Sequence, residues 1–412
     1  MLTPALVLLP TIWIVDAAAG PGSHFTDIPA AIAAASSGDT ILVRAGTYSA
    51  ISINAKELTI RGAGVGATVV NGTSHAVLAT PPGGVNVLAG LTIQGEFVTS
   101  QNARVTLLDC ALVGSATAFL GSPALRAVES EVFALRCDFT GGSVLAPASG
   151  LGPSGIGQTY AGTAVTIGGS NFAAYDCDLK GGDNFANNPF MQHAGGHGLA
   201  ASLSWARVDS CRLSGGNGMH AAGQGVYANG GSHVGIHGDA PDIVTGGTSG
   251  FSGAGPAIYV LASPFAVPSD VIVHGATPVL GTVSGPVTFA STHLPELTVA
   301  ATTLASGETD ASQPVTVTLD GLAPAALYAF LFDIRPRYAA VQAPFAGDLL
   351  LDLGTAGLFV GTLDGLGQAQ LGFVPLAIFG GSMPVPVCMQ FAVFDPSGSI
   401  RLSNLDARFY SL

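Results

Sequence analysis

Charge is what this sequence has least of. Only 9% of its 412 residues are Asp, Glu, Lys or Arg, against about a quarter in an average soluble protein. The net charge is −13 and only two lysines are present, so we expect neither a nucleic acid nor an anionic membrane surface as a partner. The run of about 18 apolar residues that a membrane-spanning helix needs is also missing, so no membrane span is expected.

Familiar catalytic signatures are missing as well. The sequence contains no Ser-His-Asp context, no phosphate-binding loop and no dinucleotide fingerprint. It also lacks the aspartate-rich loop that binds calcium in EF-hands. We therefore expect no cofactor and no metal.

What the sequence does contain is an internal repeat. Four phrases share an apolar pair, a polar residue, a cysteine and, two positions later, Leu or Phe: VTLLDCALVGS, VFALRCDFTGG, AAYDCDLKGG and WARVDSCRLSGG. A further strand precedes each phrase, so each unit is predicted to run strand, bend, strand, corner, strand and then a loop of variable length. Units of this kind stack as the coils of a parallel β-helix.

Stacking would bring the repeat cysteines into one inward-facing column: Cys110, Cys137, Cys177 and Cys211. Coils stack about 4.8 Å apart, which holds neighbouring β-carbons beyond the usual disulfide range. A straight column also cannot surround a tetrahedral zinc ion. We therefore predict buried free thiols, with a strained disulfide or a catalytic thiol as the alternatives.

The corner residue before each cysteine forms a second column, which we extend to two histidines further along the chain. Its members are Asp109, Arg136, Asp176, Ser210, His237 and His274. The alternating charge of the first three predicts mutual neutralisation along an exposed edge. Two histidines alone are a weak metal signal, so we interpret His237 and His274 as stacked turn residues.

The N-terminal segment predicts a short capping helix. It would begin near Thr26 and Asp27, with Pro29 in its first turn, and end at Gly38. Ile28, Ile32 and Ala35 could then cover the open end of the coil stack. Residues 1–11 are either part of a signal sequence or an apolar cap, while Trp13 to Asp16 fit a first strand.

This N-terminal pattern resembles that of pectate-lyase-like right-handed β-helix proteins, which have the pectin-lyase fold. The matching residues are Val15, Asp16, Ile28, Ala31, Ile32, Gly38, Asp39, Thr40, Ile41, Val43, Gly46, Thr47, Tyr48, Leu58, Ile60 and Gly62. The resemblance extends over residues 12–290. It implies a right-handed parallel β-helix and export from the cell. It does not choose among the lyases, hydrolases, epimerases, tailspikes and adhesins that share this fold.

The C-terminal part of the chain has a different character. Short alternating strands separated by Pro, Gly and Asp turns predict an antiparallel β-sandwich over residues 293–412, after a β-helix over residues 1–292. The join is expected near Thr292–Pro295. The tail resembles the closing domain of some secreted bacterial proteins, and we expect it to cover the C-terminal end of the coil stack. The predicted fold is therefore all-β.

The long loops 142–162 and 182–197 and the shorter loops 216–224 and 246–256 indicate where a site could lie. All four follow the Gly-Gly of a repeat phrase, so they should project from one edge, beside the strand that follows. Lyases and hydrolases of this fold use those loops and that strand to line their cleft. A glycan-binding groove there would use Arg126, Tyr160, Tyr227, Asn229 and Tyr259, although these tyrosines could equally be simple loop cover.

The same region offers only weak catalytic candidates, namely Asp183, His193, His197 and His220. Glycoside hydrolysis usually needs two carboxylates that flank the bond, and a uronate lyase needs a strong base with calcium or arginine. The GGHG at Gly195–Gly198 resembles the Gly-His-Gly of polygalacturonase-like hydrolases, but their paired aspartates and Arg-x-Lys are missing. A lyase, hydrolase or epimerase with a loop-borne site is therefore the alternative hypothesis.

The main hypothesis is a secreted or cell-surface protein without enzymatic activity. Sparse charge leaves flat faces of Gly, Ala, Ser and Thr that permit close approach of neighbours. We expect self-association into a fibre or lattice, with a structural or adhesive role and possible glycan binding. A monomer kept soluble by its net negative charge is the simpler alternative.

Overall fold

The computed structural model describes residues 11–411 with short gaps. Outside the described residues lie 1–10, 117–119, 145–157, 185–191, 239–242, 251, 262–267, 275–276, 291–295, 302–308, 322–323, 334–335, 340–344, 347–348, 352–355, 375–384, 395–397, 404–405 and 412. The prediction for residues 1–11 falls almost entirely outside the described residues, and so does the expected domain join at 292–295.

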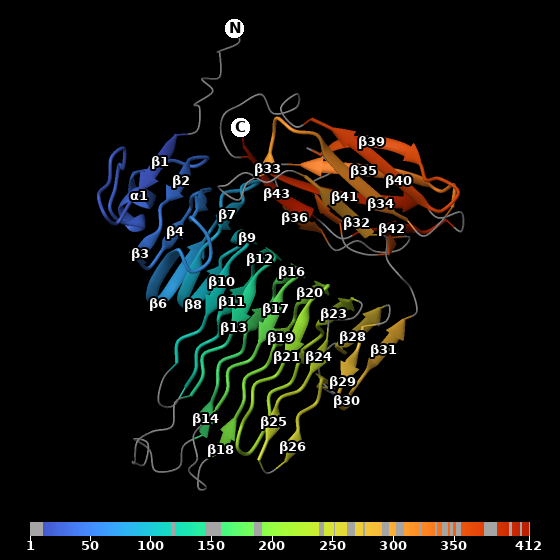
Figure 1. Ribbon diagram of the computed structural model, residues 1–412. Coiled ribbons are helices and arrows are strands. Elements are labelled where there is room, and N and C mark those ends of the chain that lie inside the picture. Colours follow the sequence, from blue (N-terminus) through green and yellow to red (C-terminus); the bar gives the residue numbers. More distant parts are fainter. Residues whose placement is uncertain are drawn as a thin grey trace.

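The chain is nearly all-β, and its N-terminal two thirds form a parallel β-helix (Figure 1). One side of every coil belongs to an 11-stranded sheet, which we call sheet A. Its strands, in spatial order, are β1 (Ile12–Val15), β2 (Thr40–Val43), β5 (Thr59–Arg61), β7 (Asn86–Ala89), β9 (Arg104–Leu108), β12 (Glu131–Leu135), β16 (Asn171–Tyr175), β20 (Trp205–Asp209), β23 (His233–His237), β28 (Asp270–His274) and β31 (Val287–Ala290).

The rest of each coil belongs to a 16-stranded sheet, which we call sheet B. Its strands on the way out from sheet A are β3 (Gly46–Ser49), β10 (Ala111–Val113), β13 (Asp138–Thr140), β17 (Asp178–Lys180), β21 (Arg212–Ser214), β24 (Val244–Thr245) and β29 (Val279–Leu280). Those on the way back are β4 (Ser52–Asn54), β11 (Leu125–Val128), β15 (Val165–Gly168), β19 (Leu199–Ser202), β22 (Val226–Asn229), β27 (Ile258–Val260) and β30 (Val283–Ser284). The long strands β6 (Thr68–Leu78) and β8 (Thr92–Ser100) take part in both rows.

The cysteine column and its corner are confirmed. The four repeat cysteines are buried at equivalent positions of successive coils, and the backbone N–H of Cys137 donates to Sγ of Cys177 over 3.3 Å. The corner residue before each cysteine has a left-handed backbone, with φ of 50° or 51° at Asp109, Arg136, Asp176 and Ser210. Arg136 binds Asp109 through two contacts of 2.6 and 3.0 Å, which is the expected neutralisation.

The assignment of His237 and His274 to that corner is wrong by one residue. In the register of sheet A, His237 pairs with Asp209 rather than with Ser210, and His274 pairs with His237. Both histidines therefore end a strand and lie on its outward side. The reason is that the coils containing these histidines lack the cysteine that marks the corner in the earlier repeats, so the sequence pattern does not fix the position of the corner there.

A short helix stands near the N-terminal coils. Helix α1 (Ile28–Ala34) begins at Asp27, whose carboxylate accepts a hydrogen bond from the N–H of Ile28, and Pro29 lies in its first turn. Ile28 and Ile32 are buried, and the helix packs against β1, β2, β3 and β4. No helix among the described residues is long and apolar enough to cross a membrane.

Each predicted loop leaves and rejoins its coil at a glycine. The outgoing glycines are Gly142, Gly182, Gly216 and Gly247, and the returning ones are Gly162, Gly196, Gly223 and Gly255. Outgoing and returning glycines alternate along one ladder of backbone hydrogen bonds of 2.7 to 2.9 Å. The two walls of the coil therefore meet here, backbone against backbone. We call this ladder the glycine column.

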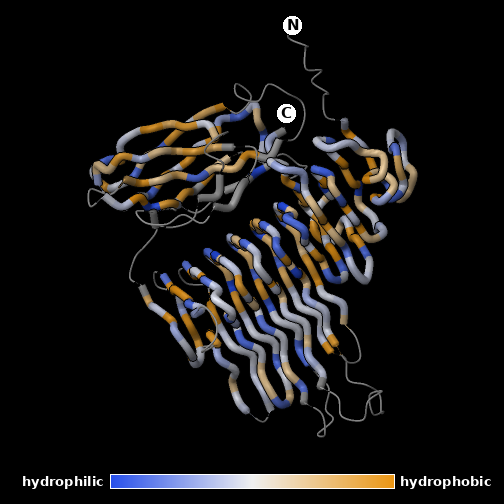
Figure 2. Tube along the Cα trace, turned by 180° about the vertical axis from the view of Figure 1, so that it is seen from behind, coloured by the Kyte–Doolittle hydropathy of each residue, from blue (hydrophilic) through white to orange (hydrophobic). Residues whose placement is uncertain are grey.

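Beyond the glycine column the described parts of the loops form a flattened extension of the coils (Figures 1 and 2). Its strands are β14 (Gln158–Tyr160), which pairs in parallel with β18 (Gln192–Ala194), and β25 (Thr248–Ser249), which pairs with β26 (Gly253–Ala254). Val144 and Ala161 form a small core of their own there. The glycine column separates this extension from the main core.

The C-terminal residues form mainly antiparallel sheets. A three-stranded sheet contains β32 (Glu296–Ala300), β34 (Val315–Asp320) and β40 (Gln368–Phe373). A seven-stranded sheet contains β33 (Thr309–Asp310), β35 (Leu327–Asp333), β37 (Phe345–Ala346), β39 (Gly357–Thr362), β41 (Val385–Phe394), β42 (Ile400–Leu402) and β43 (Asp406–Ser411). The two sheets share one apolar core. A separate pair consists of β36 (Pro336–Ala339) and β38 (Leu349–Leu351).

This C-terminal domain lies beside the coil stack, so the expectation that it covers the C-terminal end is wrong (Figure 1). Leu331 and Cys388 join Phe133, Leu135 and Tyr175 of sheet A in one buried cluster, and β36 lies beside β12 and β16. The outward face of sheet A is apolar at these coils, and burial against the domain removes that face from water.

Candidate functional site

The strand face on which we expected ligand-binding residues exists. Arg126 (β11), Tyr227 (β22) and Tyr259 (β27) occupy one row of the sheet register. Asn229 lies two residues after Tyr227 on the same side of β22. Tyr160 does not share this face, because it lies on β14 in the flattened extension, where it is 46% exposed.

One carboxylate on this face escaped the sequence analysis. Glu96 lies on β8, two residues before Val98, the register partner of Arg126. Its carboxylate is 2.6 Å from the guanidinium of Arg126. A single carboxylate that is already paired does not provide the two flanking carboxylates of a glycosidase.

The aromatic residues of this face stack on one another. The ring of His197 lies 5.2 Å from that of Tyr227, at an interplanar angle of 12°. Tyr227 in turn lies 5.9 Å from Tyr259, at an angle of 4°, and its hydroxyl accepts a hydrogen bond of 3.2 Å from Asn229. Neighbouring rings cover each other's faces, so a sugar would meet mainly their edges. This arrangement favours structural stacking over sugar binding at Tyr227.

The catalytic candidates are divided among separate contacts. His193 is buried in the extension, where its Nδ1 contacts the hydroxyl of Thr159. Its backbone N–H donates to Nδ1 of His220 over 3.3 Å, and the two rings lie 5.4 Å apart. Asp183 accepts a hydrogen bond of 2.7 Å from the backbone of Asn217. The structure thus pairs His193 with His220 and gives Asp183 a different partner.

His197 makes a separate hydrogen bond. Its Nδ1 accepts a hydrogen bond of 3.1 Å from the backbone N–H of Gln224, and burial lowers the pKa of its side chain to about 4. The glycine before His197 has a steric explanation, since a β-carbon on Gly196 would lie 1.9 Å from the carbonyl oxygen of Gly162. The Gly-His-Gly match therefore belongs to the glycine column. Among the described residues, no group of three His, Cys, Asp or Glu side chains could hold a metal.

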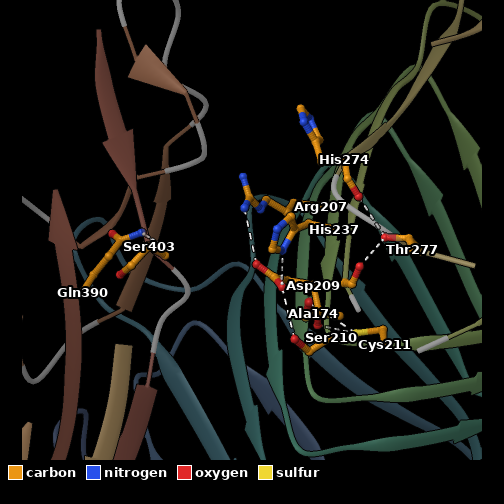
Figure 3. A network of polar contacts seen from close by, with 11 residues as sticks. Ala174, Arg207, Asp209, Ser210, Cys211, His237, His274, Thr277, Gln390 and Ser403 are labelled. Atoms are coloured by element: carbon orange, nitrogen blue, oxygen red, sulfur yellow. Dashed lines mark hydrogen bonds and ion pairs between the residues drawn. The ribbon is translucent and has the colours of Figure 1, made fainter. Parts of the chain in front are cut away.

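A buried polar cluster on sheet A was not predicted (Figure 3). Asp209 lies 3.4 Å from the guanidinium of Arg207 and 3.0 Å from Nδ1 of His237. Burial opposes ionisation of Asp209, but the hydrogen bond from His237 and the charge of Arg207 outweigh it and hold its pKa below the usual value. Burial, with the positive charge of Arg207, lowers the pKa of His274 to about 4.

The ion pair of this cluster is closed to solvent. Arg207 and Asp209 are 6% and 3% exposed, and they continue the outward face of sheet A that the C-terminal domain covers. In Figure 3, Arg207 extends toward the side on which Gln390 and Ser403 of that domain are drawn. We therefore interpret the cluster as a polar part of the interface between sheet A and the C-terminal domain, not as an open reaction site.

Comparisons with known proteins include a distant structural likeness. No protein-family model matches the chain, and no curated protein matches its sequence. Among solved structures, the chain is similar to a pectin methylesterase from Aspergillus niger, with 13% sequence identity and a TM-score of 0.32. The match covers 68% of this chain and 83% of that chain. It is too distant to carry an activity over, because one fold hosts many functions.

Proposed function

We propose that this protein is a non-enzymatic, secreted or cell-surface component with a structural, self-assembling or adhesive role. In this proposal it is built as a right-handed, pectate-lyase-like β-helix with a C-terminal β-sandwich. The observation that carries the proposal is the uncovered edge of the last coil.

The last coil ends in edge strands with exposed apolar side chains. Strands β29, β30 and β31 end their rows in sheets A and B, and among the described residues nothing pairs with their outer edges. Phe289 is 61% exposed, and Leu280 and Val283 are exposed as well. Such an edge is a template for pairing with another chain.

The sequence of this coil offers little to block that pairing. Natural proteins protect free edges with lysine, proline or inward-facing charges. Residues 271–290 contain no Asp, Glu, Lys or Arg, and their two prolines, Pro278 and Pro286, precede β29 and β31 rather than lie within them. A second copy of this chain is the partner that this edge fits best. Contact between unlike ends would build an open fibre, whereas contact between like ends would stop at a dimer.

The other support is that the chemically suggestive residues already have partners. Glu96 pairs with Arg126, His197 stacks on Tyr227, and Asp183 binds a backbone N–H. The alternative, a carbohydrate-active enzyme, is favoured only by the adjacency of His193 and His220 in the extension.

Sedimentation velocity at micromolar concentration tests the self-association. We expect species larger than the monomer, and we expect Phe289→Lys to return them to monomer by placing a charge on the edge. Leu366→Lys is the matched control, because Leu366 is 79% exposed on the turn between β39 and β40. A monomeric wild type, or an equal effect of the two substitutions, would contradict the proposal.

A further inference from the structure

A groove of about 310 Å³ lies at the corner where the returning strands of sheet B lead into sheet A. One wall holds Asn102 and Glu129, two corner residues with left-handed backbones (φ of 59° and 48°). The other wall holds Arg104, Glu131 and Asn171, which are register partners at the first position of β9, β12 and β16. The groove therefore runs along the axis of the coil stack, on the opposite side of strand β11 from the predicted loops.

Ser130 lines the groove and belongs to a row of serines. The following coils place Ser170 and Ser204 at the equivalent position. Each backbone N–H in this row donates to the serine hydroxyl of the next coil, over 3.1 Å from Ser130 to Ser170 and again from Ser170 to Ser204. These small, hydrogen-bonded residues fix the spacing of the walls, so the groove is part of the rigid coil.

An exposed tryptophan follows directly in the same row. Trp205 is the register partner of Asn171, and it is 44% exposed. One side of its indole packs on His233, with ring centroids 4.3 Å apart, and Nδ1 of His233 contacts the carboxylate of Asp270. His233 therefore fixes one side of the indole. On the other side, the neighbouring residue in the register is Asn171, which lines the groove.

These observations lead us to propose that the groove and Trp205 form a binding site for a neutral oligosaccharide. Amide, carboxylate and guanidinium groups on the walls match the hydroxyls of a sugar, which both donate and accept hydrogen bonds. The apolar face of a pyranose ring matches an indole that is large, rigid and amphipathic. Three coil steps from Arg104 to Trp205 span roughly 14 Å, the length of a short oligosaccharide.

The charge of the groove selects against acidic sugars. Arg104 and Glu131 form an ion pair of 3.1 Å and neutralise each other, which leaves Glu129 as the net charge of the lining. A uronate carboxylate would meet this like charge, which disfavours binding. Neutral hexoses or N-acetylated hexosamines are therefore the ligands that fit. This site deepens the adhesive part of the proposed function and rests on it.

The test is binding of the full-length protein to an array of neutral, N-acetylated and uronic oligosaccharides, followed by titration of the best neutral ligand. Trp205→Ala should weaken binding at least tenfold, whereas Trp205→Phe should retain most of it. Phe394→Ala is the matched control, since this aromatic residue is 40% exposed but lies on β41 of the C-terminal domain, and it should leave binding unchanged.

Equal binding by wild type and Trp205→Ala, with an unaltered thermal unfolding curve for the variant, would overturn the assignment. A preference for uronic over neutral sugars would overturn it too. If the wild type assembles through its last coil but binds no saccharide, the groove assignment fails and the structural role stands. If saccharide binds but no assembly occurs, the self-association fails and the groove stands.

Discussion

The glycine column makes a steric prediction that can be tested with one added methyl group. A β-carbon on Gly196 would lie 1.9 Å from the carbonyl oxygen of Gly162 and 2.6 Å from its carbonyl carbon. Both atoms belong to the backbone, so they cannot rotate away as a side chain could. Gly196→Ala should therefore force the two walls of the coil apart.

The expected cost combines overpacking with lost hydrogen bonds. Overpacking in a well-packed interior costs about 1 to 3 kcal/mol. Gly196 also donates to Gly182 over 2.9 Å and accepts from Gly216 over 2.7 Å, and each buried bond that is broken costs about 1 kcal/mol or more. We expect a loss of about 3 to 5 kcal/mol in the free energy of unfolding, a large part of the usual 5 to 15 kcal/mol.

Gly168 provides the matched control within the same coil stack. It lies in β15, and a β-carbon there would meet no atom within 4 Å. Gly168→Ala should be neutral or stabilise the protein by up to about 1 kcal/mol, because alanine restricts the unfolded chain. Denaturant titrations of both variants, followed by circular dichroism, give the comparison. A difference below about 1 kcal/mol, within the scatter of ordinary surface substitutions, would refute the close backbone packing.

Two further predictions concern the interior. A thiol reagent should leave Cys110, Cys137 and Cys177 unreacted in the native protein, because burial raises the pKa of each thiol well above its usual value; unfolding without reductant should release them, and a disulfide found by mass spectrometry would contradict this. The free energy of unfolding should fall from pH 6.5 to pH 4 as the unfolded chain takes up a proton that His197, with its pKa of about 4, does not bind in the fold. His197→Asn should remove up to about 3 kcal/mol of that fall, and identical pH profiles would show that His197 is not responsible.

The repeat was readable from the sequence because its determinants are local. The same corner precedes each of the four repeat cysteines. Its polar residue marks the turn, and the cysteine that follows marks the buried column. This signal disappears after Cys211, since the coils that contain His237 and His274 have no cysteine. The register there was misjudged by one residue, and the buried contact between Asp209 and His237 was missed as a result.

The sequence contains a sign that sheet A is covered on its outward face. The strands VTLL, VFAL and FAAY are buried on both faces, whereas HVGIH alternates between buried and partly exposed residues. Continuous apolar runs are typical of strands covered on both sides. They indicate that something covers sheet A, but they do not identify the covering segment, which depends on contacts with Leu331 and Cys388 far along the chain.

The candidate site was predictable only in part. Alternation placed Arg126, Tyr227 and Tyr259 on one face, but the ring stacking depends on the spacing of neighbouring coils. The groove beside Trp205 requires two corners and three strands to come together. Its residues are widely separated in the sequence and follow no shared motif, so periodicity could not single them out.

The claim that separates this account from an enzymatic one is that the protein does not break glycosidic bonds. The most direct measurement is the chain length of a panel of neutral and uronic polysaccharides after prolonged incubation with the purified protein, read by size-exclusion chromatography. We predict unchanged length distributions across the panel. Shortening of any polysaccharide by the wild type, abolished in a His193→Ala or His220→Ala variant that still folds, would contradict the account.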